Sequence, residues 1–83
     1  MYLDEFKEHF GWLLGVSRTE CYYDEICFEL INLKTEKVLL DEFSGDEKNF
    51  WDVEEFDSLE IVEWKISYSN KKSVYLIKVF VEL

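Results

Sequence analysis

The C-terminal stretch LEIVEWKISYSNKKSVYLIKVFVE, residues 59–82, decides the fold. Apolar side chains recur at every second position in both halves of this stretch, which is the period of a strand with one buried face. In residues 59–69 the side chains that share one face are Val62, Trp64, Ile66 and Tyr68. In residues 73–82 they are Tyr75, Ile77, Val79 and Val81. The polar turn at Asn70, Lys71 and Lys72 predicts that the two strands pair as an antiparallel hairpin.

A second hairpin is predicted earlier in the chain. Residues 21–33 read as a strand with Ile26, Phe28 and Leu30 on one face and acidic side chains on the other. Residues 34–37 form a polar break, and residues 38–43 read as the returning strand.

The N-terminal residues 2–14 have the pattern of an amphipathic helix. Four apolar side chains recur at spacings of three and four: Leu3, Phe6, Phe10 and Leu13. Asp4 and Glu5 fall in the first turn, where the helix dipole favours anions, and Gly15 is a suitable C-terminal stop.

Residues 44–58 connect the two hairpins and fit two structures. Ser44 and Glu47 have the spacing of a capping box, which predicts a short acidic helix, and an irregular acidic loop fits as well. Together the elements predict one α+β domain over residues 1–83. In this fold the N-terminal helix packs on a four-stranded antiparallel sheet made of two hairpins.

Catalytic, metal and cofactor sites lack their usual sequence signals. His9 is the single histidine, and Glu5 one helical turn earlier is too little for a zinc site, which takes three or four ligands. Cys21 and Cys27 lie in strand-like sequence, where buried structural thiols are common. The three glycines form no phosphate-binding loop. We therefore predict a protein that is not an enzyme and that needs no cofactor or metal.

The chain also lacks the features of export and of membrane insertion. Its first residues are acidic, with no basic segment followed by an apolar core, and no apolar run approaches the roughly 20 residues of a membrane span. These features predict a cytoplasmic protein with no membrane partner.

The distribution of charge is the most unusual feature of the sequence. The chain has a formal net charge of −10, and residues 41–63 hold ten acids and one base. By contrast, the last 20 residues are weakly basic. Nucleic acid is therefore not expected as a direct partner, because binding it needs a basic face. The tract predicts a surface that meets a basic protein, and its candidate residues are Asp41, Glu42, Asp46, Glu47, Trp51, Asp52, Glu54, Glu55, Asp57, Glu60 and Glu63.

The spacing of these acids matches the scale of a phosphate backbone. The six acids from Asp52 to Glu63 would span about 18 Å as a helix or about 40 Å as a strand. A single DNA strand carries one charge per roughly 3.4 Å. Phe50 and Trp51 lie among the acids, so we expect the tract to be folded in place. We expect Phe50 to belong to the core, and Trp51 would be either core or an exposed anchor for a partner.

Short length, net acidity, the α+β pattern and the tract from Asp41 to Glu63 resemble the small acidic inhibitors of bacterial defence that phages encode. Anti-CRISPR and other DNA-mimicking proteins form this class, and the resemblance concerns composition and one segment. It implies an inhibitor that acts in the host cytoplasm on a basic nucleic-acid-binding protein or nuclease complex. A toxin-neutralising immunity protein is an alternative that the same features fit. A structural protein that self-associates through an open strand edge is another, and both a monomer and a homodimer stay open.

Overall fold

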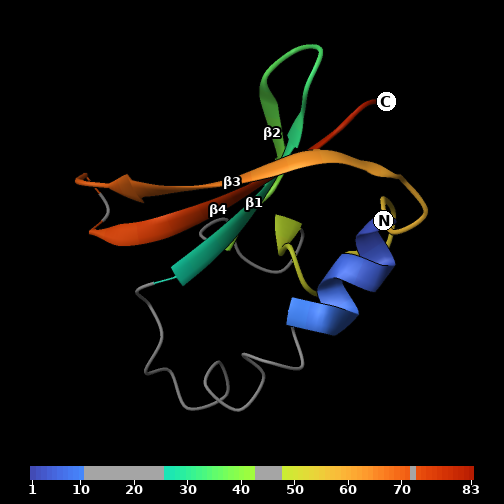
Figure 1. The fold of residues 1–83 in the computed structure, drawn as a ribbon, viewed down its shortest axis with the longest axis horizontal. Coiled ribbons are helices and arrows are strands. Elements are labelled where there is room, and N and C mark those ends of the chain that lie inside the picture. Colours follow the sequence, from blue (N-terminus) through green and yellow to red (C-terminus); the bar gives the residue numbers. More distant parts are fainter. Residues whose placement is uncertain (11–25, 43–47, 72) are drawn as a thin grey trace.

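The computed structural model describes residues 1–10, 26–42, 48–71 and 73–83 (Figure 1). Its four strands are β1 (Ile26–Asn32), β2 (Lys37–Leu40), β3 (Ile61–Ser69) and β4 (Val74–Val81). They form one sheet in the order β2-β1-β4-β3, and residues 3–10 form a short helix. The α+β prediction is confirmed.

The sheet is mixed, so the prediction of a purely antiparallel sheet is wrong. Both predicted hairpins form in the described residues, with β1 antiparallel to β2 and β3 antiparallel to β4. Residues 21–25 and 43 of the predicted first hairpin lie outside the described residues. The two hairpins join through β1 and β4, which run parallel, with Ile26 opposite Tyr75 and Asn32 opposite Val81. β1 and β4 carry apolar side chains on both faces, and most of their residues are buried. The two central positions of the sheet suit such strands, because neighbouring strands and packed layers cover them.

The second helix predicted for residues 44–58 does not form in the part of the segment that the structure describes. Lys48 has 3-10 conformation, Asn49 forms an isolated bridge, and residues 50–58 consist of turns and irregular backbone. Asp41 donates its backbone N–H to the Lys48 carbonyl at 2.8 Å and accepts from the Phe50 N–H at 3.0 Å. These two bonds form an isolated parallel bridge between Asp41 and Asn49, which ties this part of the connection to the end of β2. Ser44 and Glu47 lie outside the described residues.

The short helix begins where its sequence predicts. Glu5 Oε1 accepts the backbone N–H of Tyr2 at 2.9 Å, which is one half of a capping box. The first helical hydrogen bond runs from the Phe6 N–H to the Tyr2 carbonyl at 3.0 Å. Leu3 and Phe6 are fully buried, as the apolar spacing predicts. The remainder of the predicted helix, residues 11–14, is not described.

The main core lies between one face of the sheet and a layer made of the helix and residues 48–60. Its buried members are Leu3, Phe6, Phe28, Leu30, Leu40, Phe50, Ile77, Val79 and Val81. Phe28 and Phe50 stack with ring centroids 5.3 Å apart. At the edge of this core, the Trp64 ring of β3 packs edge-on against the rings of Phe6 and Phe10. On the other face of the sheet, Cys27, Val74 and Leu76 form a smaller cluster, and Cys21 lies outside the described residues.

The turn between β1 and β2 places Glu36 in the left-handed region, at φ 59°. A residue with a Cβ is strained there and glycine is not, so Glu36→Gly is expected to raise the free energy of unfolding by about 0.5–1 kcal/mol. Urea unfolding measures this change, with Glu36→Ala, which keeps the Cβ, as the control. A glycine variant no more stable than the alanine variant would contradict the expectation.

Candidate partner-binding surface

The acidic connection packs directly along the N-terminal helix. The Leu3 N–H donates to the Leu59 carbonyl at 2.9 Å, and the Asp4 N–H donates to the Asp57 carbonyl at 3.0 Å. At the start of β3 the Ile61 N–H donates to the Met1 carbonyl at 2.8 Å. Residues 57–61 therefore run beside the first residues of the chain, and the two segments form one layer.

Lys7 fixes this layer from inside. Its ammonium group lies 2.6 Å from Asp57 Oδ1 and 2.7 Å from the Val53 carbonyl oxygen, to both of which it donates. It also lies over the Phe50 ring, 5.6 Å from the centroid, which adds a cation–π contact. The Lys7 side chain is nearly buried, so this contact is shielded from water in a way that a surface ion pair is not. One lysine thus holds the helix to two points of the acidic connection.

The aromatic residues of the tract anchor it to the core. Phe50 is fully buried, as predicted. Trp51 is half-buried and packs edge-on against Phe28 and Phe50, with ring centroids 4.9 and 5.0 Å apart. Its indole N–H donates to Glu42 Oε1. Trp51 is therefore part of the packing of the tract on the core, and only part of its side chain is exposed.

The predicted site residues fall into two groups. Four are exposed on the layer formed with the helix, and they are Asp52, Glu54, Glu55 and Glu60. The others that the structure describes have contacts of their own. Asp57 binds Lys7, Glu42 accepts from Trp51, and Asp41 is held by its backbone. Glu63 lies on β3, and its Oε1 is 3.8 Å from Lys65 Nζ. Asp46 and Glu47 are outside the described part of the chain.

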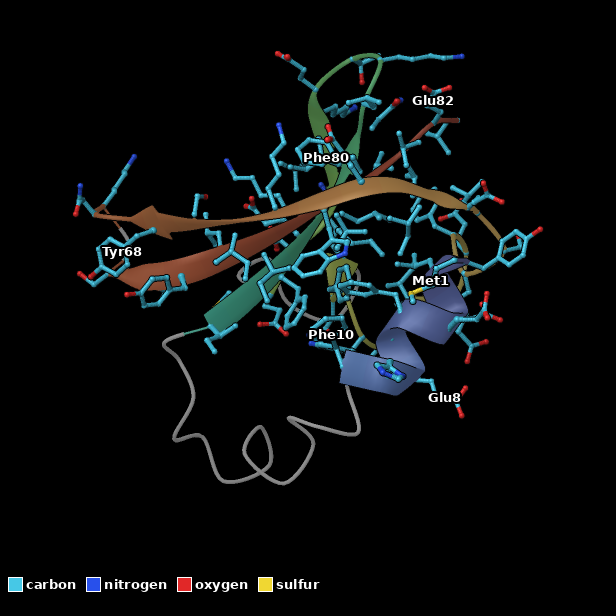
Figure 2. All side chains as sticks on the ribbon, viewed as in Figure 1. Met1, Glu8, Phe10, Tyr68, Phe80 and Glu82 are labelled. Atoms are coloured by element: carbon cyan, nitrogen blue, oxygen red, sulfur yellow. The ribbon has the colours of Figure 1, made fainter. Side chains whose placement is uncertain are left out.

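The helix contributes carboxylates that were not among the candidate residues predicted from the sequence. Asp4, Glu5 and Glu8 are exposed, and Figure 2 shows Glu8 on the outer side of the helix, away from the sheet. Residues 1–10 and 48–60 together hold eight acids and two bases, and Lys7 is one of these bases. We call this part of the molecule the acidic layer. The sequence signal for the acidic layer is the acidity of the helix. Only the packing of the helix against the tract shows that the two belong to the same layer.

The β3–β4 hairpin has the opposite charge balance. Among its described residues, Lys65, Lys71 and Lys78 outnumber Glu63. Lys65 also lies over the Phe80 ring, 5.5 Å from its centroid. Among the described residues, the acidic layer therefore places eight acids and two bases, a net charge of −6, on one face of the sheet.

The described residues contain no group of three or more histidine, cysteine, aspartate or glutamate side chains arranged to hold a metal ion. His9, the single histidine, is exposed on the helix. Within the same residues there is no helix whose length and apolar character would let it cross a bilayer.

The chain was compared with known proteins at three levels. No protein-family model, no curated protein and no solved structure matches it.

Proposed function

We propose that this protein is a small inhibitor that binds a basic nucleic-acid-binding protein or nuclease complex and competes with nucleic acid for it. The observation that carries the proposal is the acidic layer, which holds eight acids and two bases. One of these bases, Lys7, is already bound to Asp57. A phage or another mobile element is the proposed source of such an inhibitor.

The first support is that the negative charge sits on a folded surface. Residues 53–60 are tied to the helix by Lys7 and by backbone hydrogen bonds, and Phe50 anchors them to the core. Charges that are already positioned lose less conformational entropy on binding than charges on a loose tail do. A partner with a basic groove would therefore meet a preformed array.

The second support is the physical effect of this array on association. Concentrated charge of one sign steers an oppositely charged partner and speeds the encounter, and salt weakens the effect. A surface that replaces nucleic acid in a basic groove also releases the ions held there. We therefore expect binding that salt weakens steeply and that duplex DNA reverses.

The experiment uses the immobilised full chain and a nuclease-treated bacterial lysate at low salt. Captured proteins are washed with a neutral polymer and then with duplex DNA. The DNA is expected to elute them and the polymer is not, because the proposal places both ligands on the same basic groove. Elution by neither, or by both equally, would show that the chain does not compete with nucleic acid.

The matched variants test the acidic layer itself. Glu54→Lys/Glu55→Lys reverses two exposed charges of the layer, and Glu36→Lys/Glu82→Lys reverses two exposed charges elsewhere. The first variant is expected to capture at least about tenfold less target, which corresponds to about 1.4 kcal/mol, and the second to capture as much as the unchanged chain. Equal capture by both would contradict a role for the layer. Asp57 is kept because it binds Lys7.

The immunity-protein alternative rests on the same layer, because a toxin nuclease also has a basic groove. The identity of the eluted protein and the neighbouring genes separate the two. A toxin nuclease encoded beside this chain would favour an immunity protein, and a defence complex with phage genes nearby would favour the inhibitor.

A further inference from the structure

Among the residues that the structure describes, the outer side of β3 is an open strand edge. β3 is the last strand of the sheet and is nine residues long, whereas β2 at the opposite edge has four. Met1 meets the outer side of β3 at Ile61 only. Along residues 63–68 no backbone segment among the described residues pairs with this side. A long strand with free N–H and C=O groups is a template for another strand, and proteins commonly protect such edges.

The side chains of β3 do little to protect this edge. Trp64 is 46% exposed, Ile66 59% and Tyr68 51%, all on the face of the sheet that carries the helix. Figure 2 shows Tyr68 at the far end of the sheet from the helix. Glu63 and Lys65 lie on the opposite face, and their charges cancel. In a chain with a net charge of −10, this strand is therefore a place where two copies can approach with little repulsion.

The order of side chains along β3 is complementary to itself in one antiparallel register. When a two-fold axis passes beside Trp64, Glu63 of each copy lies opposite Lys65 of the other, and both charges are paired. Trp64 then faces Trp64 across the axis, and Val62 lies at the register shift between Ile61 and Glu63, outside this regular pairing. Moving the axis to Lys65 would place two lysines opposite each other. Moving it to Ile66 would place both charged residues opposite serines.

We propose that two copies of this chain pair antiparallel through the outer edges of β3, with Trp64 at the two-fold axis, so that one sheet continues across both copies. A two-fold interface needs a patch that is complementary to itself, and the Glu63–Trp64–Lys65 sequence meets that requirement. A strand from a different protein would gain nothing from this symmetry. The proposal uses none of the charges of the acidic layer, which lie in residues 1–10 and 48–60.

Charge exchange tests both the dimer and its register. Glu63→Lys and Lys65→Glu each turn two opposite-charge pairs into two like-charge pairs, so each is expected to weaken dimerisation on the order of tenfold. The double variant Glu63→Lys/Lys65→Glu restores both pairs and is expected to dimerise within about threefold of the unchanged chain. Light scattering coupled to gel filtration over a dilution series measures the dissociation constant. Urea unfolding at a concentration where all variants are monomeric checks that each one folds.

Three outcomes would overturn the proposal. These are an unchanged chain that stays monomeric over the whole dilution series, a dimer whose dissociation constant neither single change alters, and a double variant that does not recover dimerisation. Glu54→Lys/Glu55→Lys is expected to dimerise normally, so that a failure of the target-binding experiment and a failure of the dimer remain distinguishable.

Discussion

Replacement of Phe6 by alanine is expected to lower the free energy of unfolding by about 3–5 kcal/mol, the largest loss we expect from a single substitution in this chain. Phe6 is fully buried at the centre of an aromatic cluster. Its ring stacks on Phe10 at 4.4 Å and meets the rings of Phe28, Phe50 and Trp64 edge-on between 6.0 and 6.4 Å. The substitution would leave a cavity between the helix and the sheet, where the surrounding side chains can relax only in part.

Tyr68→Ala is the control for this prediction, because it also removes an aromatic ring but from a position that is 51% exposed. Its expected loss is below about 1 kcal/mol, since surface substitutions rarely cost more. Small domains have only about 5–15 kcal/mol of stability, so the two variants should have clearly different urea midpoints. Similar midpoints would mean that Phe6 does not hold the helix on the sheet.

The second large effect concerns the ion pair between Lys7 and Asp57. Asp57→Asn is expected to cost about 2–3 kcal/mol, because it leaves the nearly buried Lys7 ammonium group without its counter-charge. The expected loss is below that of a fully buried pair, since the Asp57 side chain is 27% exposed and water would reach the gap. Lys7→Met is expected to cost less, because the Asp57 carboxylate left behind can be hydrated while the apolar stem is kept.

The double variant Lys7→Met/Asp57→Asn distinguishes this explanation from a simple loss of packing. It removes the buried charge together with its partner, so it should be more stable than Asp57→Asn alone. Lys65→Met is the matched control, because the Lys65–Glu63 pair is exposed and such pairs contribute about 0–1 kcal/mol. A double variant as unstable as Asp57→Asn would show that Lys7 is not the source of the penalty.

The sequence predicted the elements of this fold better than their arrangement. Leu3 and Phe6 at helical spacing and the alternation around Trp64 are local signals, and the helix and strands formed where these signals lie. The expectation that this alternation marks a buried face is wrong for β3, because its apolar side chains are exposed: Val62, Trp64, Ile66 and Tyr68. Pairing between strands distant in the chain has no local signal. The preference for antiparallel neighbours therefore missed the parallel contact between β1 and β4. The clue was the composition of VYLIKVF, residues 74–80, which is almost continuously apolar and suits a strand buried on both faces.

The candidate surface was predictable to a similar degree. The count of acids along residues 41–63 located the tract, and Phe50 was correctly expected to lie in the core. Counting could not show that Asp57 would be bound to Lys7, because that contact joins residues far apart in the chain. For the same reason it could not add Glu8 to the surface. Net charge follows from composition, but the residues that share a surface are decided by tertiary packing.

The parallel contact of β1 with β4 has a consequence for how the molecule reaches its native state. The central pair of the sheet consists of the first and the last strand, so the middle of the core closes only after the distant ends of the sheet-forming sequence meet. Contacts of such long range make folding slower than in helical proteins of the same size. Until β4 docks, β1 has only β2 beside it, and the net charge of −10 disfavours self-assembly of the chain in this interval.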